Sequence, residues 1–192
     1  MRQCHPLLPS LWLLTDARND AVLEEAIARL PRGSGLIYRH YHLPPPQRLA
    51  RLAVLARRMR ARGGLVVLAG TMAQARRWGA EGAYGAAAQV GPGARGLRLA
   101  TVHSLREIGA ARRLRADALV LSPAFATRSH PGAPGLGVLG WRGLARHAGG
   151  QVVALGGMNA AHARRLGAGA WAAVDGLSGK RKKPLDHCRG AA

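Results

Sequence analysis

Short aliphatic runs alternate along the chain with longer segments in which apolar residues recur at helical spacing between arginines. This repeated change of period indicates strands that are each followed by a helical crossover, and therefore an α/β protein with a parallel sheet. Eight runs have the length of a buried strand: residues 11–15, 35–38, 65–69, 82–84, 99–103, 118–122, 152–155 and 171–174.

Six of the intervening segments have the pattern of amphipathic helices: residues 20–29, 47–62, 72–78, 104–115, 139–147 and 159–166. Two of them begin with a recognisable cap. Ser104 stands three residues before Glu107, as in a capping box, and Asn159 directly follows a pair of glycines. Residues 86–96 contain three glycines and a proline, so we expect little or no helix there.

Eight βα units predict a closed (β/α)8 barrel of the TIM type, at 192 residues a short one. The alternative is an open doubly wound sheet. Such a sheet would carry a Gly-x-Gly-x-x-Gly turn after its first strand if it bound a dinucleotide, and the sequence LLTDA at residues 13–17 has none. We expect residues 1–179 to form a single barrel domain and residues 180–192 to form a basic, disordered tail.

The charge balance is strongly basic: 29 Lys and Arg residues face nine Asp and Glu residues, which gives a formal net charge of +20. A hydrophobic content of 48% nevertheless indicates a globular chain rather than a disordered one. Arginines occur in nearly every predicted helix and only 4% of residues are aromatic, which disfavours a nucleic-acid surface with stacking platforms. A barrel that binds a polyanion through its outer arginines stays open as an alternative.

Cys4 and Cys188 lie near opposite ends of the chain, so cysteines alone supply neither a zinc cluster nor a disulfide framework. Pro9, Ser10 and Asp16 interrupt the first apolar stretch, which therefore lacks the core of a signal peptide. No apolar run is long enough to span a bilayer. These features predict a cytoplasmic protein without a membrane segment.

In a barrel of this kind the active site lies at the carboxyl ends of the strands, and the loops after the seventh and eighth strands often hold phosphate. Here these loops read GGMN at residues 156–159 and DGLSG at residues 175–179. Gly156, Gly157 and Gly176 are therefore candidate anion contacts through their backbone N–H groups. The alternative is that the paired glycines only make a tight turn between strand and helix.

A long loop follows the sixth strand at residues 122–137. Hydroxyls at Thr127 and Ser129 alternate in it with Arg128 and His130, a combination of positive charge and hydrogen-bond donors that suits a phosphate or diphosphate. The alternative is a solvated Pro/Gly loop, although loops of this length in compact domains usually carry function.

The sequence RHYH follows the second strand at residues 39–42. Arg39 is expected to point toward the mouth of the barrel, and the two histidines are candidate acid–base groups. No carboxylate neighbours His40 or His42 in the sequence, which disfavours a metal site there. His103, at the end of the fifth strand, is either a site residue or an anchor for the turn at Ser104.

Four segments together resemble the thiamine phosphate synthase and thiazole tautomerase family of small barrels. LWLLTD at residues 11–16 resembles the family's LYLVTD, and TVHS at residues 101–104 resembles its Ser-x-His-Thr turn. The loop at residues 122–137 resembles the family's GPVFxTxTKPGAPxLG, and ALGGMN at residues 154–159 resembles AIGGIN. The resemblance covers most of the chain, and the long loop followed by the Gly-Gly turn is its most specific part.

The resemblance implies a transferase that joins a hydroxymethylpyrimidine diphosphate to a thiazole phosphate and releases pyrophosphate in thiamine biosynthesis. The pyrimidine methylene passes through a carbocation-like state, so the protein mainly binds, orients and stabilises the departing charge. By position, the catalytic residues implied are Arg39, Thr127 and His130. The residues implied to contact substrate or phosphate are Tyr38, Thr101, His103, Arg128, Ser129, Gly156, Gly157, Asp175 and Gly176.

The chain departs from the family's magnesium site. The Asn-Asp pair after the third strand is Ala69 and Gly70 here, and no acidic residue occurs in residues 86–90, where a second aspartate is expected. Asp175 replaces a serine, and its charge would repel a phosphate unless it points away or is protonated. No cofactor is therefore identifiable, and we expect arginine to neutralise the diphosphate directly. The other interpretation is a family member that binds or isomerises a thiazole phosphate, or has lost activity.

Overall fold

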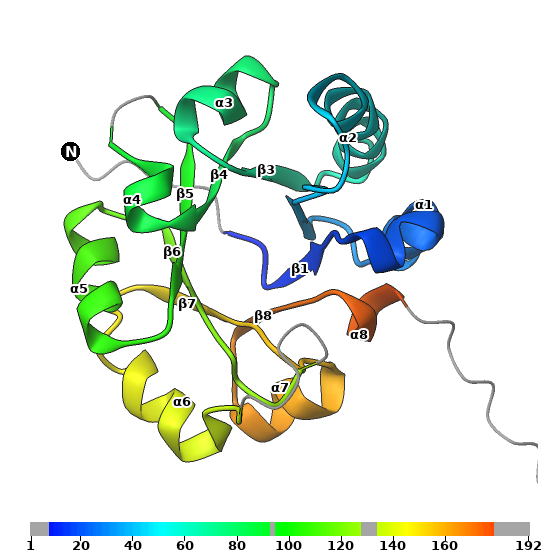
Figure 1. Ribbon diagram of the computed structural model, residues 1–192. Coiled ribbons are helices and arrows are strands. Elements are labelled where there is room, and N and C mark those ends of the chain that lie inside the picture. Colours follow the sequence, from blue (N-terminus) through cyan, green and yellow to red (C-terminus); the bar gives the residue numbers. More distant parts are fainter. Residues whose placement is uncertain (1–7, 93–94, 128–133, 179–192) are drawn as a thin grey trace, which may run out of the picture.

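Eight parallel strands close into a barrel in chain order, with β8 paired to β1, as the sequence predicts (Figure 1). The computed structural model describes residues 8–92, 95–127 and 134–178. The strands are β1 Leu11–Leu14, β2 Gly35–Tyr38, β3 Leu65–Ala69, β4 Gly82–Ala86, β5 Leu97–Val102, β6 Ala118–Leu121, β7 Gln151–Ala154 and β8 Ala170–Ala173. The predicted tail at residues 180–192, and Arg128, Ser129 and His130, lie outside the described residues.

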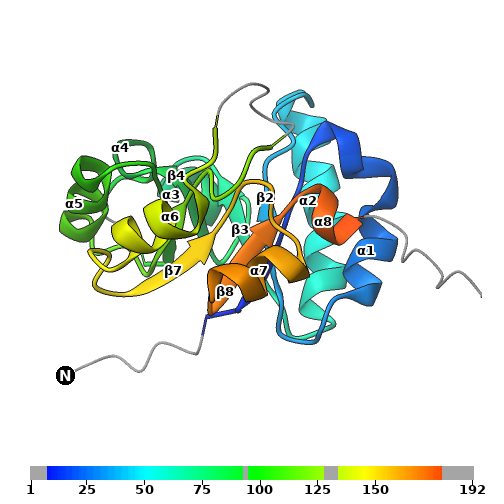
Figure 2. The ribbon, with the colours of Figure 1, turned by 90° about the horizontal axis from the view of Figure 1, so that it is seen from below.

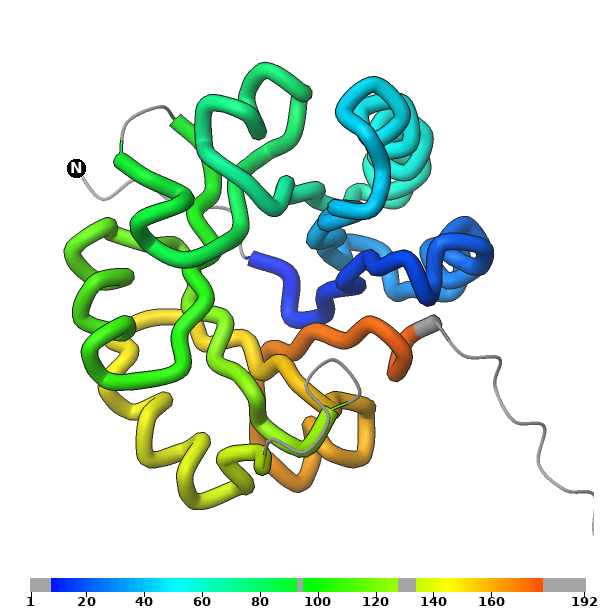
Figure 3. The backbone as a smooth tube through the Cα atoms, in the orientation of Figure 1, coloured from blue at the N-terminus to red at the C-terminus, as the bar shows by residue number. Residues whose placement is uncertain are grey.

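Helices surround the strands (Figure 3). In chain order they are a 3-10 helix η1 Ala17–Val22, α1 Leu23–Arg29, α2 Pro45–Arg60, α3 Met72–Arg77, α4 Ala87–Val90, α5 Leu105–Arg113, α6 Gly137–Ala145, α7 Ala160–Leu166 and α8 Asp175–Ser178. Turned by 90°, the barrel shows α8 beside α1, which places the segment after β8 next to the segment after β1 (Figure 2).

Local chemistry explains where the helices begin. The Ser104 and Asn159 side chains accept backbone N–H groups of the first turns of α5 and α7, as expected. The segment predicted as one helix at residues 20–29 divides instead into η1 and α1. A capping box between Asp16 and Asn19 starts η1 directly after β1, and the chain turns again at Val22.

The core has two layers. Inside the barrel lie residues that alternate along the strands, among them Trp12, Leu14 and Ile37. Between the sheet and the helices lie their neighbours, among them Leu13 and Leu36. Trp12 is fully buried, and a Cβ at Gly35 would overlap its ring, so the barrel interior accommodates the indole only because glycine stands opposite. No helix among the described residues is long and apolar enough to cross a membrane.

Candidate active site at the mouth of the barrel

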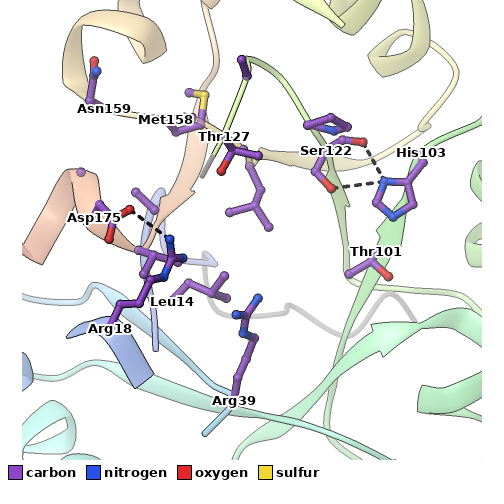
Figure 4. A pocket seen from close by; sticks show the side chains of 18 of the residues that line it. Leu14, Arg18, Arg39, Thr101, His103, Ser122, Thr127, Met158, Asn159 and Asp175 are labelled. Carbon is purple, nitrogen blue, oxygen red and sulfur yellow. Dashed lines mark hydrogen bonds and ion pairs between the residues drawn. The ribbon is translucent and has the colours of Figure 1, made fainter. Parts of the chain in front are cut away.

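A cavity of about 1080 Å³ lies at the carboxyl ends of the strands, with its labelled side chains converging from opposite sides of the barrel (Figure 4). Loops after six of the strands contribute to its wall. The lining residues are Leu14, Arg18, Arg39, Tyr84, Thr101, His103, Ser122, Pro123, Ala126, Thr127, Leu155, Gly156, Gly157, Met158, Asn159, Ala173, Val174, Asp175 and Gly176.

The structure brings most of the predicted site residues into this one cavity. They are Arg39, Thr101, His103, Thr127, Gly156, Gly157, Asp175 and Gly176. The roles of these residues toward a substrate stay predictions. Arg18, Tyr84 and Ser122 also line the cavity and were not singled out from the sequence. The signal that points to them is their place within four residues of the carboxyl end of a strand.

Tyr38 does not reach the cavity, so the structure does not support it as a substrate contact. Successive residues of a strand face opposite sides of the sheet, and Ile37 is the neighbour that faces the barrel interior. Tyr38 is fully buried on the outer side beneath α2, where its hydroxyl donates a hydrogen bond to the Arg48 carbonyl oxygen at 2.8 Å. Burial raises the pKa of Tyr38, which keeps the hydroxyl protonated.

Arg39 carries the positive charge on the β2 side of the cavity. Its Nη2 donates to the Asp16 carboxylate, and its Nε is buried with no hydrogen-bond partner among the described residues. The backbone N–H of Arg39 donates to Thr15 Oγ1 at 2.9 Å, which fixes the point where the chain leaves β2. One donor of the guanidinium is therefore buried without a partner among the described residues.

Two carboxylates and two guanidinium groups form a chain of ion pairs across this mouth. Asp16 contacts Arg39 and also Arg18, whose Nη1 lies 3.6 Å from an Asp175 oxygen (Figure 4). Burial raises the pKa of Asp16, but hydrogen bonds from Arg18 and the charge of Arg39 outweigh it and hold the pKa below its usual value. From the sequence, Asp175 is expected to repel a bound phosphate. In the structure its carboxylate faces Arg18, which partly balances that negative charge.

His103 and Ser122 meet on the opposite side of the cavity (Figure 4). His103 Nδ1 lies 2.7 Å from the Ser122 carbonyl oxygen and 3.3 Å from its hydroxyl. A carbonyl oxygen only accepts, so the imidazole is assigned with its proton on Nδ1 when neutral, which leaves Nε2 as an acceptor. An exposed acceptor nitrogen at the cavity can receive a proton or hold a substrate hydroxyl or amine.

The Gly-Gly turn after β7 is shaped by the β6 loop that lies on it. Gly156 and Gly157 have φ values of 92° and 61°, in the region that favours glycine. A Cβ at Gly156 would stand 2.7 Å from the Cα of Pro123. Phe125 donates its backbone N–H to the Gly156 carbonyl at 3.1 Å, which joins the two loops. Among the described residues neither glycine donates its N–H to a backbone acceptor, so both donors are available to an anion.

His162 supports this turn from α7. Its Nδ1 lies 2.6 Å from the Gly157 carbonyl oxygen, and its ring lies 4.4 Å from that of Phe125, measured between centroids. Its backbone N–H donates to the Asn159 side chain at 2.9 Å, so the cap of α7 already uses that donor. Sequence reasoning missed His162, because its contacts cross from a helix back to the loop.

The residues present do not fit the magnesium site of the family. Ala69 ends β3, and the side chain of Gln74 occupies the space where a Cβ of Gly70 would stand. Gln89, in α4, lies in the same way against Gly85 near the carboxyl end of β4. Amide side chains thus fill the places beside these strands where carboxylates would be needed. We derive no catalytic step through magnesium at this position.

A closed barrel with a cavity at the carboxyl ends of its strands, into which charged side chains point, defines a (β/α)8 barrel protein with its site in the usual place for this fold. Comparison with family profiles is more specific. The profile of the family described as thiamine monophosphate synthase matches residues 11–177, and the chain belongs to that family.

Solved structures agree on the fold. A thiamine phosphate pyrophosphorylase from Pyrococcus furiosus aligns with a TM-score of 0.69 at 23% identity, over 87% of this chain and 85% of the other. A thiamine phosphate pyrophosphorylase from Bacteroides thetaiotaomicron aligns with a TM-score of 0.58 at 16% identity, over 93% of this chain and 89% of the other. A search of curated proteins found no match.

Proposed function

We propose that the chain is a divergent transferase of the thiamine phosphate synthase type, which joins a hydroxymethylpyrimidine diphosphate to a thiazole phosphate. The observation that supports this most is that Arg39, Thr127 and the Gly156-Gly157 turn border a single cavity, on loops after three different strands. Arg39 and the Gly156-Gly157 turn come from different sides of one cavity, and Thr127 stands beside the turn, an arrangement that suits two phosphorylated substrates that must react with each other.

In the proposed reaction the bond between the pyrimidine methylene and the diphosphate oxygen breaks, and the methylene carbon forms a bond to the thiazole. Pyrophosphate leaves with the electron pair of the broken bond. Arg39 and Thr127 stabilise the charge that develops on that leaving group, while Gly156 and Gly157 hold the thiazole phosphate through their N–H groups. In this proposal the leaving pyrophosphate is also bound by Arg128, Ser129 and His130.

The magnesium-binding carboxylates expected after β3 and β4 are absent. Their absence favours a second candidate: a family member that keeps the phosphate cavity but catalyses another reaction or only binds its ligand. Proton transfer on a bound thiazole phosphate would need an acid–base group in the cavity. His103, whose Nε2 is an acceptor in the assigned tautomer, is the residue in position for it. Both candidates take a phosphorylated small molecule.

A thermal-shift screen with thiazole phosphate, pyrimidine diphosphate and pyrophosphate separates the two, because a ligand that binds only the folded state raises the midpoint of unfolding. The transferase predicts stabilisation by both substrates and formation of thiamine phosphate from the pair without added Mg²⁺. Stabilisation by thiazole phosphate alone, with no product, would favour the second candidate. A rate that depends entirely on added Mg²⁺ would contradict charge neutralisation by arginine.

The role of Arg39 is tested directly with Arg39→Ala. Loss of a charge-assisted contact of about 1.5–3 kcal/mol is expected to weaken pyrophosphate binding by about 10- to 100-fold in a calorimetric titration. Arg57→Ala, which removes an exposed arginine from α2, is the matched control and should leave the affinity unchanged. Equal pyrophosphate affinities of Arg39→Ala and the parent chain would remove Arg39 from the site.

A further inference from the structure

A second, smaller cavity of about 200 Å³ lies beside the first, between the loops that follow β1 and β2. Arg39 borders both cavities. His40 and His42 line the second one. Together with Asp20 they each offer a metal-binding atom, and these atoms all lie within 4.8 Å of one another. The sequence around the two histidines lacks a carboxylate, but the fold brings one to them from Asp20 in η1.

His40 is the central member of this Asp20–His40–His42 cluster. Its side chain has no exposure to solvent, and its Nε2 has no hydrogen-bond partner among the described residues. Asp20 Oδ1 lies 2.9 Å from Nε2, at the distance of an ion pair, and lowers the cost of burying that nitrogen. A buried ring nitrogen that faces a carboxylate at this distance can share a cation with it.

The other ring nitrogen of His40 is oriented. His40 Nδ1 lies 2.8 Å from Thr15 Oγ1, so when a cation takes the lone pair of Nε2, Nδ1 carries the proton and Thr15 Oγ1 can accept it. Metal-binding histidines characteristically donate the proton of the second ring nitrogen to a neighbouring acceptor, which fixes the tautomer and the ring plane. Thr15 is fully buried, so this contact is rigid.

A tight turn places His42 next to His40. The backbone of His40 has a φ of 41°, and Leu43 donates its N–H to the His40 carbonyl oxygen at 3.1 Å. The two imidazole rings then lie 5.0 Å apart between centroids. His42 is exposed, so its ring is free to rotate toward a bound ion.

Arg51 holds the carboxylate of Asp20 in place and leaves it able to accept a further partner. Arg51 Nε donates to Asp20 Oδ1 at 2.7 Å, while its terminal nitrogens bind Glu24. Glu24 therefore balances the charge of Arg51. An Asp20 carboxylate has two oxygens with several lone pairs, so one hydrogen bond leaves it able to bind a cation.

We propose that Asp20, His40 and His42 form a binding site for a divalent transition-metal ion such as Zn²⁺, distinct from the family's magnesium position. Two imidazoles and one carboxylate form a ligand set that suits Zn²⁺ and related first-row ions. A tetrahedral ion about 2.1 Å from each ligand requires ligand atoms about 3.4 Å apart. A rotation of His42 and a small movement of Asp20 away from His40, from which its Oδ1 now lies 2.9 Å, would provide this spacing. His40 and His42 also line the small cavity, together with Asp16, Arg39 and Tyr41, so open space lies beside the proposed site.

The test uses Co²⁺ as a spectroscopic probe for Zn²⁺ and the full-length chain, stripped of metal beforehand. We expect one equivalent of Co²⁺ to bind with the visible absorption of a four- or five-coordinate ion and to be displaced by Zn²⁺. His42→Ala should weaken binding by at least about 100-fold, since loss of a ligand exceeds the 10- to 100-fold effect of losing a ligand's hydrogen-bond partner. Because His42 is exposed, the variant should fold, which circular dichroism checks.

Three controls make the result decisive. His147→Ala, which removes another exposed histidine, should bind as the parent does. Asp20→Asn keeps an oxygen for Arg51 but should lose the ion. A Cys4→Ser, Cys188→Ser double variant should retain the site, because thiolates play no part in it. Absence of a bound equivalent in the parent, unchanged binding in His42→Ala, or loss of the ion in the double cysteine variant would each overturn the proposal.

Discussion

At the scale of single residues, Asp16 does three things with one carboxylate. It caps η1, and it binds both Arg18 and Arg39. Any anion that binds Arg39 shares that guanidinium with Asp16. The affinity of the site for phosphate therefore depends on how far the ligand supplements or replaces this contact.

The charge of Asp16 should make the free energy of unfolding depend on pH. Its pKa is lower in the folded chain than its usual 3.8, so the ionised form stabilises the fold at neutral pH, and this contribution is lost as the pH falls below about 4. Asp16→Asn keeps the helix cap but removes the charge. We expect the free energy of unfolding to drop by about 1 kcal/mol at pH 7, with the difference shrinking toward pH 3.

Urea unfolding of the two proteins across that pH range measures this. Glu25→Gln is the control, because Glu25 lies in an exposed pair with Arg29 at 3.4 Å, where little stabilisation is expected. A difference between Asp16→Asn and the parent that stays constant down to pH 3 would contradict an effect of charge, and equal stabilities at pH 7 would show that the carboxylate acts only as a cap.

At the scale of elements, Arg48 in α2 holds the carboxyl ends of two strands together. Its Nε donates to the Arg39 carbonyl at 2.7 Å and its Nη2 to the Ala69 carbonyl at 2.8 Å, so one side chain bridges β2 and β3 where the chain enters the site. The guanidinium also lies over the rings of Tyr41 and Trp78. Arg48 is only 9% exposed, so these charge-assisted hydrogen bonds are strong and their loss should lower the free energy of unfolding.

Arg48→Met keeps most of the volume but removes the donors to the buried Ala69 carbonyl oxygen and the partly buried Arg39 carbonyl oxygen. We expect a loss of about 2–3 kcal/mol in the free energy of unfolding, measured by denaturant titration. Arg48→Lys should recover only part of it, because an ammonium group does not reproduce the fork of the guanidinium. The exposed Arg57→Met in the same helix should change stability by less than about 0.5 kcal/mol. Similar losses for the two methionine variants would contradict the bridging role.

The elements differ in how well the sequence predicts them. All eight strands and the caps at Ser104 and Asn159 are readable locally, because apolar runs and side-chain caps are short-range signals. The outward face of Tyr38 is not, since every residue of Gly35–Tyr38 is buried and no alternation marks the inner side. The Asp20–His40 contact is also invisible locally, because only the pairing of β1 with β2 brings the two loops together.

At the scale of the whole molecule, the arginines among the described residues are distributed around the barrel rather than gathered at its mouth. Exposed arginines occur on helices all the way round, including Arg58 on α2, Arg77 on α3, Arg113 on α5 and Arg165 on α7. Dispersed positive charges of this kind attract polyanions weakly and in no defined position, whereas a basic groove would hold them in place.

Electrophoretic binding assays with single-stranded RNA test this distribution. We expect weak complexes at low salt that disappear at physiological salt and show no preference for sequence, because counterion release alone drives them. Neutralising Arg112 and Arg113 on α5 should reduce binding no more than neutralising Arg76 and Arg77 on α3. A complex that persists at physiological salt and depends on one helix would favour the polyanion-binding alternative.

Trp12 has a consequence for the order of events in the cavity. In the described part of the chain its indole fills the barrel axis at the end opposite the mouth, with its Nε1 donating to the Pro9 carbonyl at 2.7 Å. A molecule in the cavity therefore enters and departs on the same side. If two ligands occupy it together, the one that lies deeper must arrive first and leave last, so the fold itself imposes a sequence on binding and release.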